Sequence, residues 1–300
     1  MSFNNMIPKS LSLNPTYIAE SAWWQHVPIA HWLVETIKPK RIVELGTHLG
    51  VSFFAFCEAA GAFSPSTFTY AIDTWGGDEH ASFYGEEIFA RVRNHWESTH
   101  KSRSTLIRSD FDTALQYFED SSIDILHIDG LHTYEAVKHD FETWLPKMNE
   151  NSLILFHDIN VRERGFGVWK LWQELKTNYK TFEVMNGHGL GLLILGDRIN
   201  NEIDNFSNLS SAFISKGALL ERISHLSEEA NVNINLIAQA KAENLQTKAE
   251  ANQAVAELMK IKQSQFWILT RPVRKIFNLL IRQIKGLRRE RAKKLNYKES

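Results

Sequence analysis

The sequence contains almost no cysteine and no long hydrophobic run, and these absences narrow the class of protein. Cys57 is the only cysteine among 300 residues, so no disulfide can form within one chain. A lone thiol suits a reducing compartment. No uninterrupted apolar run reaches the roughly 18 residues that a membrane-spanning helix needs. The start, Met-Ser-Phe-Asn-Asn, lacks a basic region followed by an apolar core, so no signal peptide is predicted. We therefore expect a cytoplasmic protein.

The charge is unevenly distributed along the chain. The formal net charge is only −1, yet residues 260–300 contain thirteen Lys or Arg and two Glu, a surplus of +11. Residues 1–259 therefore carry −12. An acidic body with a basic end predicts that the end contacts an anionic surface, which would place the protein peripherally at the inner face of the cell membrane.

Residues 1–200 alternate between short apolar runs and segments with helical spacing. The expected strands are residues 41–45, 68–73, 105–108, 123–129 and 152–157. Runs at 181–185 and 189–195 flank Asn186-Gly187, a strong signal for an antiparallel hairpin. Strands separated by helices predict a parallel sheet with right-handed crossovers. The predicted fold is therefore α/β, a Rossmann-like seven-stranded sheet with an antiparallel closing hairpin, in a domain of residues 1–200.

Residues 201–264 have a different composition, with few aromatic residues and much Ala, Asn, Gln, Glu and Lys. A 3-4 spacing of mostly apolar positions runs from Ile223 to Ile261 and predicts a long helix in a coiled coil. Asn233 and Asn244 would then set the register, and the chain would be a homo-oligomer, either a dimer or a trimer. The alternative is a single long helix that folds back on the domain.

Residues 265–300 form a third segment, in which apolar and basic residues separate on a helix. The apolar residues Ile276, Leu279, Leu280 and Ile284 fall on one side, and Lys and Arg residues crowd elsewhere. With Phe266-Trp267 leading it, this pattern predicts a basic amphipathic tail at an anionic membrane surface. Nucleic acid is the alternative partner, because phosphates reward the same charges. The apolar side favours lipid.

A glycine-bearing turn follows the first expected strand, in Glu44-Leu-Gly-Thr-His-Leu-Gly50. Gly46 would let the backbone turn under a ligand, and Gly50 would let the next helix pack closely. The turn lacks a third glycine and a Walker lysine, which argues against dinucleotide or triphosphate binding in the usual modes. Asp73 ends the second strand, where an acid can bond to ribose hydroxyls. Asp110 follows the third strand, at the position of an adenine contact. A helix cap is the alternative role for each acid.

Histidine and aspartate follow the next two strands. Asp129 and His132 come after the fourth strand, and His157 and Asp158 end the fifth. Because the carboxyl ends of parallel strands line the ligand crevice, we expect these side chains to converge. Asp129 and Asp158 could hold Mg²⁺, with His157 as a further ligand, and His132 could take a proton from a hydroxyl. The alternatives are two helix caps and a solvated loop histidine.

Residues 20–196 resemble a class I S-adenosylmethionine-dependent methyltransferase of methyltransferase domain family 24. The motifs that carry the resemblance are Val43-Glu-Leu-Gly46 with Gly50, Ile72-Asp-Thr-Trp-Gly-Gly-Asp78, His127-Ile-Asp-Gly-Leu-His-Thr-Tyr-Glu135, Asp140-Phe-Glu-Thr-Trp-Leu-Pro146 and Leu155-Phe-His-Asp158. The antiparallel closing hairpin is typical of this class. The resemblance implies that Glu44, Gly46 and Asp73 hold the methionine and ribose parts of S-adenosyl-L-methionine, with Asp110 near the adenine.

The same resemblance bears on the chemistry. Asp129, His132 and Asp158 are similar to the metal and base positions of magnesium-dependent sugar and catechol O-methyltransferases. One departure is that Ile159 separates Asp158 from Asn160, whereas catechol-type enzymes follow the second acid directly with Asn.

The acceptor is expected to be a sugar or glycan hydroxyl. Trp75, Asp78 and Tyr84, with His80 and Trp169, are candidates for a substrate rim, because sugars stack on aromatic rings and bond to carboxylates. Residues 264–274 also resemble a segment of bacterial surface-polysaccharide glycosyltransferases, which implies polysaccharide biosynthesis. Two alternatives stay open: a non-catalytic glycosyltransferase-associated scaffold, and a metal-dependent oxygenase or hydroxylase that uses His132, His157 and Asp158.

Overall fold

The computed structural model describes residues 7–78, 80, 82–197, 199, 203, 206 and 210–296, and it leaves the side chains of Asp78, Ser82 and residues 287–296 undescribed. The chain divides into two compact units, Met1–Glu229 and Ala230–Ser300. The first unit therefore continues past the boundary that the sequence places at residue 200.

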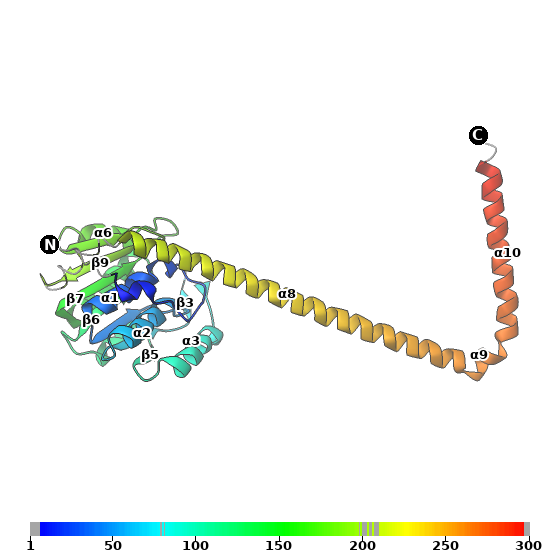
Figure 1. Cartoon of the computed structure of the whole chain (residues 1–300), viewed down its shortest axis with the longest axis horizontal. Helices are drawn as coiled ribbons and strands as arrows, with labels where there is room; N and C mark the ends of the chain where they lie inside the picture. Colours follow the sequence, from blue (N-terminus) through cyan, green and yellow to red (C-terminus); the bar gives the residue numbers. More distant parts are fainter. Residues whose placement is uncertain are drawn as a thin grey trace. The chain divides into compact units, whose positions relative to one another are not determined.

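A seven-stranded sheet forms the centre of the first unit (Figure 1). Its strands lie in the order β5 (Ser104–Arg108), β2 (Phe68–Asp73), β1 (Arg41–Leu45), β6 (Ile123–Ile128), β7 (Met148–His157), β9 (Leu190–Leu195) and β8 (Lys180–Val184). The first five pair in parallel, and β9 runs antiparallel to both β7 and β8. The predicted sheet and closing hairpin are confirmed. The strand order reverses between β1 and β6, which is where such sheets open a ligand crevice.

Helices cover both faces of the sheet, which explains the continuous apolar runs of its central strands. The helices are α1 (Val27–Ile37), α2 (Val51–Phe63), α3 (Glu86–Thr99), α4 (Phe111–Ala114), α5 (Tyr134–Trp144) and α6 (Val168–Leu175). Short 3-10 turns lie at Lys9–Ser12, Trp24–His26, Leu115–Tyr117 and Leu145–Lys147. Neighbouring β1 residues point to opposite sides: Ile42 packs in the core with α1 and α2, whereas Val43 packs in the core with α5 and α6.

A small hairpin was not expected from the sequence. β3 (Gly77–Asp78) and β4 (Ser82–Phe83) pair antiparallel between β2 and α3. Two-residue strands are too short to show an alternating pattern, so periodicity could not reveal them.

The long helix α8 (Ser210–Gln263) begins inside the first unit. Phe213 and Leu220 are buried in the core that contains α1 and α2. A Cβ at Gly217 would lie 2.2 Å from the carbonyl oxygen of Gln25, so glycine permits this close approach. The packing explains why the first unit extends to Glu229. The predicted long helix is confirmed, and its pairing with a second copy stays a prediction.

The second unit contains the rest of α8, a short α9 (Gln265–Leu269) and α10 (Arg271–Asn296). Ser264 caps α9, since its Oγ accepts a hydrogen bond from the Trp267 amide at 3.2 Å. Pro272 lies in the first turn of α10, where its missing N–H has no cost. Within the residues that the structure describes, no helix is long and apolar enough to cross a membrane.

Candidate active site

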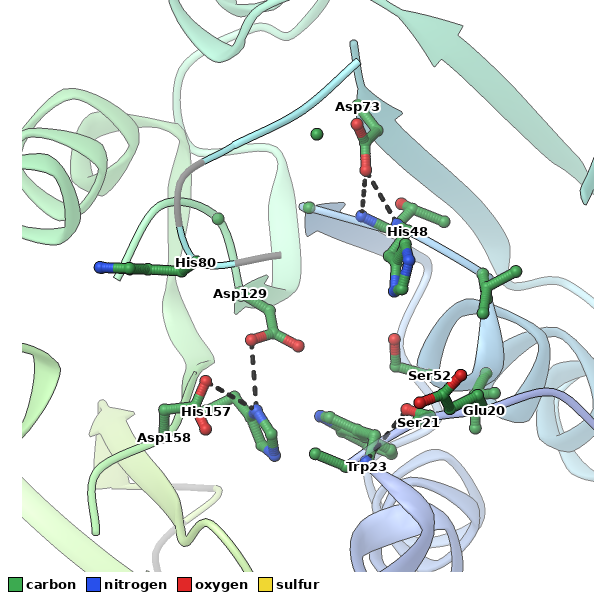
Figure 2. Close-up of a pocket in the computed structure, with 18 of the residues that line it drawn as sticks. Glu20, Ser21, Trp23, His48, Ser52, Asp73, His80, Asp129, His157 and Asp158 are labelled. Atoms are coloured by element: carbon green, nitrogen blue, oxygen red, sulfur yellow. Dashed lines mark hydrogen bonds and ion pairs between the residues drawn. The ribbon is translucent and has the colours of Figure 1, made fainter. Parts of the chain in front are cut away.

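A cavity of about 860 Å³ opens at the carboxyl ends of the central strands. Gly46 follows β1, Asp73 ends β2, Asp129 follows β6 and His157 ends β7, and all four line the cavity. Figure 2 shows Asp73 next to the turn at His48. It shows Asp129, His157 and Asp158 close together on another part of the cavity wall. The structure therefore brings together the residues that the sequence places at successive strand ends.

The glycine turn lies very close to the loop that follows β6. Gly46 has φ +86°, and a Cβ there would lie 2.1 Å from the carbonyl oxygen of Asp129. Only glycine fits a position that combines a left-handed conformation with such contact. Gly50 has φ +83° and precedes α2 as its N-cap residue. The turn thus exposes backbone along the floor of the cavity.

Asp73 fastens the glycine turn to β2. Its Oδ2 accepts hydrogen bonds from the amides of Thr47 and His48, both at 2.8 Å, and its Oδ1 accepts one from the Trp75 amide at 2.6 Å. Asp73 does not cap a helix, so the helix-cap alternative for this residue is wrong. The carboxylate has further lone pairs and lines the cavity, so it can also accept from a ligand hydroxyl.

Asp110 takes the capping role that the sequence offered as the alternative to an adenine contact. Its Oδ1 accepts a hydrogen bond from the Thr113 amide at 2.8 Å and caps α4. This bonding lowers the pKa of the Asp110 carboxyl. The residue also lines the cavity.

Glu44 lies in the interior and does not line the cavity. Its Oε2 is 2.9 Å from Nδ1 of His127, while the indole of Trp23 donates to Nε2 of His127 at 3.1 Å. Because Nε2 accepts, the ring carries its hydrogen on Nδ1, and this N–H donates a hydrogen bond to Glu44. Glu44 was expected to contact the cofactor directly. The structure instead places it in a buried chain of hydrogen bonds with His127 and Trp23.

Four side chains at the carboxyl ends of β6 and β7 form a compact cluster. His132 Nε2 lies 2.9 Å from Asp158 Oδ2 and 3.3 Å from Asp129 Oδ1. His157 Nδ1 lies 3.2 Å from Asp129 Oδ1 and 3.3 Å from Asp158 Oδ2. His188, from the loop between β8 and β9, places Nδ1 2.7 Å from Asp158 Oδ1. We call Asp129, His132, His157 and Asp158 the strand-end cluster.

The two aspartates of the strand-end cluster do not cap helices. Thr133 is the residue that caps α5, accepting from the Ala136 amide at 3.2 Å. The next helix, α6, begins at Val168 after Gly167 and has no side-chain cap. Asp158 instead adopts φ +62°, an uncommon conformation outside glycine that concentrates at functional sites. The cap alternative therefore falls for both Asp129 and Asp158.

Electrostatics hold the strand-end cluster as two carboxylates and two imidazoliums. Burial raises the pKa of Asp129 and Asp158, but the charge of His157 and the hydrogen bonds of the histidines outweigh it, so both pKa values fall below their usual range. Burial lowers the pKa of the two histidines, but the aspartates outweigh it and raise the pKa of His132 to about 9 and that of His157 to about 10. The region between the carboxylates thus favours positive charge.

The expected substrate rim is only partly observed. Tyr84 lines the cavity, and so does His80. Trp75 is buried, with its indole donating to the carbonyl of His48 at 3.0 Å, and it does not line the cavity. Trp169 donates to the carbonyl of Phe166 at 3.0 Å and is also absent from the lining. The side chain of Asp78 lies outside the described residues.

Several lining residues had no signal in the sequence. They are Glu20, Ser21 and Trp23 before α1, Ser52 in α2, Arg164 and Phe166 after β7, His188, and Glu221, Ser224, His225 and Glu228 of α8. Phe166 stacks on His132, with ring centres 4.5 Å apart and planes 8° apart. The α8 residues reach the cavity only because the helix packs on the domain, and no local pattern reports such a contact.

Comparison with known proteins identifies the domain. Residues 43–159 match the family model described as a methyltransferase domain. This match supports the predicted methyltransferase family and enzyme class for these residues. The sheet has the strand order and the closing hairpin that the sequence predicts for the class I type.

Other relatives are similar in part. The uncharacterized protein y4gI of Sinorhizobium fredii is 51% identical over 179 residues, which are 60% of this chain and 20% of that protein. The chain thus spans about a fifth of that relative's length. A methyltransferase from Geobacter sulfurreducens is 21% identical, covering 59% of this chain and 80% of its own, with a TM-score of 0.45. A putative caffeoyl-CoA O-methyltransferase from Staphylococcus aureus is 17% identical, covering 65% and 93%, with a TM-score of 0.46.

Proposed function

We propose that this chain, which carries a class I methyltransferase domain, uses S-adenosyl-L-methionine to methylate a hydroxyl of a sugar or glycan, assisted by Mg²⁺. The observation that carries the proposal is the meeting of a glycine turn, the ribose-type acid Asp73 and the strand-end cluster in one cavity. A cofactor and an acceptor can therefore lie side by side there.

The cofactor half of the proposal rests on β1 and β2. The turn at Gly46 leaves backbone free to lie against the methionine part, and Asp73 can accept from the ribose hydroxyls. Asp110 and Phe111 line the side where the adenine would lie. The acidic lining suits a sulfonium cation.

The strand-end cluster suits a divalent cation. Asp129, His132 and Asp158 each offer one ligand atom, and these atoms lie within 4.8 Å of one another. Mg²⁺ prefers carboxylate oxygens, so Asp129 and Asp158 would hold it, and His157 would orient both carboxylates rather than bind. When bound, the ion would hold the acceptor oxygen and ease loss of its proton.

The departure after Asp158 has a structural consequence. Ile159 is buried, and the side-chain amide nitrogen of Asn160 donates to the carbonyl of Met185 at 3.5 Å. A proposed Mg²⁺ would take its ligands beyond Asp129 and Asp158 from water and the acceptor, as this ion commonly does.

His132 is the proposed general base. Its Nε2 belongs to the strand-end cluster, and the stacked ring of Phe166 fixes its plane. With its pKa raised to about 9, His132 keeps its proton until the charge of Asp129 and Asp158 is compensated. A cation held by Asp129 and Asp158 would provide that compensation and would allow His132 to act as the base. Orientation would supply most of the acceleration of an in-line methyl transfer.

The acceptor proposal rests on the remaining walls. Tyr84 and Phe83 offer aromatic rings for a sugar face, and Phe83 is 78% exposed. Glu20 and Glu228 can accept hydrogen bonds from hydroxyls. The scaffold alternative lacks support, because a scaffold has no need of a buried His/Asp cluster at the strand ends.

The test is methyl transfer from labelled S-adenosyl-L-methionine to sugar nucleotides and hydrolysed glycans. We expect turnover that falls by about a hundredfold or more in His132→Ala, the range for loss of a general base. His139→Ala is the matched control, because His139 is exposed on α5 and does not line the cavity. Equal loss in both variants, or no methylated product with any acceptor, would contradict the proposal.

A further inference from the structure

The second compact unit ends in a helix pair, α9 and α10, whose apolar and basic side chains are separated. At ~100° per residue, six apolar residues of α10 fall within an arc of about 140°. They are Val273, Ile276, Phe277, Leu280, Ile281 and Ile284, which are between 37% and 67% exposed. We call this set the apolar face. No packing within the described part of the second unit buries it.

The basic residues occupy the other side of α10. Arg271, Arg274, Lys275, Arg282 and Lys285 fall within an arc of about 100° that does not overlap the apolar face. No acid occurs between Ser264 and Gly286. Leu279 was expected on the apolar side, but among the described side chains of α10 it is the one large apolar residue that lies away from the apolar face, and it is 62% exposed. The segregation is thus nearly complete.

Helix α9 adds large apolar side chains at a fixed corner. Phe266 and Leu269 are 76% and 77% exposed. The guanidinium of Arg274 lies 3.6 Å from the ring centre of Trp267 and donates to the Trp267 carbonyl. The indole is therefore tied to the start of α10, and an indole with a cation on its face suits a boundary between apolar and wet surroundings.

We propose that α9 and α10 lie flat on an anionic lipid surface, with the apolar face inserted between the lipids and the basic residues at the headgroups. Charge complementarity selects this occupant. A second copy of the helix would cover the apolar face but would leave the cations without acidic partners, since neither copy has an acid between Ser264 and Gly286. A nucleic acid would neutralise the cations but leave the apolar face in water. An anionic lipid surface buries the apolar face and also neutralises the basic residues.

The test uses the full chain with phosphatidylcholine vesicles, with and without phosphatidylglycerol. We expect binding to the anionic vesicles and hardly any to the neutral ones. Leu280→Asp should weaken binding about tenfold or more, because it places a charge in the apolar face, whereas Leu279→Asp should weaken it about threefold or less. The two variants change adjacent leucines by the same charge, so they differ only in the side of the helix.

The outcomes separate the other occupants. Equal weakening by the two leucine variants, or equal binding to neutral vesicles, would overturn the proposal. So would tighter binding to duplex or single-stranded nucleic acid than to anionic vesicles. The protein could also form an oligomer without lipid. If Leu280→Asp dissociates that oligomer and added lipid does not, the apolar face binds a second copy and the proposal is wrong. Unchanged circular dichroism and S-adenosylhomocysteine binding in each variant would show that the fold is intact.

Discussion

His132 Nε2 and Asp158 Oδ2 lie 2.9 Å apart, although the residues follow different strands. Asp158 follows β7 in a left-handed conformation, and its carboxylate contacts the loop after β6 through His132. His188 contacts the other oxygen of the same carboxylate at 2.7 Å. One aspartate therefore joins the loops after β6, β7 and β8, and any change there should disturb all three.

The role of Asp73 gives the first prediction. Asp73→Ala should weaken S-adenosylhomocysteine binding about tenfold or more, because ribose would lose two hydrogen bonds at roughly 1 kcal/mol each and the turn would lose its anchor. Calorimetry measures the change. Asp112→Ala is the control, since Asp112 pairs with exposed His139 and does not line the cavity. Undiminished affinity in Asp73→Ala would remove this residue from the site.

The proposed metal gives the second prediction. Chelation by EDTA should lower activity and Mg²⁺ should restore it, with weaker recovery in Asp129→Asn because one carboxylate ligand is lost. Direct binding of Mn²⁺, followed by paramagnetic resonance, should weaken in the same variant. Full activity in the presence of chelator would contradict the metal assignment, but it would not contradict the methyltransferase assignment.

The boundary of the first unit gives the third prediction. A chain that ends at Glu229 should fold, bind cofactor and have a smaller oligomeric order than the full chain. A chain that ends at Phe206 should be much less stable, because it lacks the buried Phe213 and Leu220, worth about 3 kcal/mol or more each. Sedimentation and denaturant unfolding measure both effects. An unchanged oligomer in the chain ending at Glu229 would show that residues 230–300 do not cause assembly.

Buried His31 gives the fourth prediction, on stability against pH. Burial, helped by the charge of Lys216, lowers the pKa of His31 from 6.5 to about 3. Below pH 6.5 the unfolded chain therefore binds a proton that the folded chain refuses, and the free energy of unfolding falls as the pH drops. The slope from one such group is at most ~1.4 kcal/mol per pH unit between pH 6.5 and 3.

The variant His31→Leu should flatten this acid limb by one group's share. Urea unfolding at several pH values measures the slope. His139→Gln is the control, because His139 is exposed and the neighbouring Asp112 raises its pKa. The same slope in wild type and His31→Leu would show that His31 does not resist protonation in the folded state.

The sequence predicted the site residues that lie at the carboxyl ends of strands. Asp73, Asp129 and His157 follow apolar runs whose order along the chain determines that they meet at one sheet edge. The hairpin around Asn186-Gly187 was equally predictable, because its turn chemistry is local. These features need only periodicity and a connection rule.

Features that depend on tertiary packing were missed. Nothing near Glu221 signals that α8 reaches the cavity, since its contact depends on Phe213 and Leu220 entering a core formed far upstream. Trp75 was expected at the rim, yet its positive φ and its bond to His48 turn the ring inward. A Trp at a strand end can face either way, and only the neighbouring packing decides.

Cofactor binding by the purified full chain tests the central claim most directly. Calorimetry should show that S-adenosyl-L-methionine and S-adenosylhomocysteine each bind one site per chain, that Asp73→Ala weakens both, and that NAD and ATP do not compete. Mass spectrometry of the protein as purified should find the same cofactor. Absence of binding by both compounds, or preferential binding of NAD or ATP at the same site, would contradict the account.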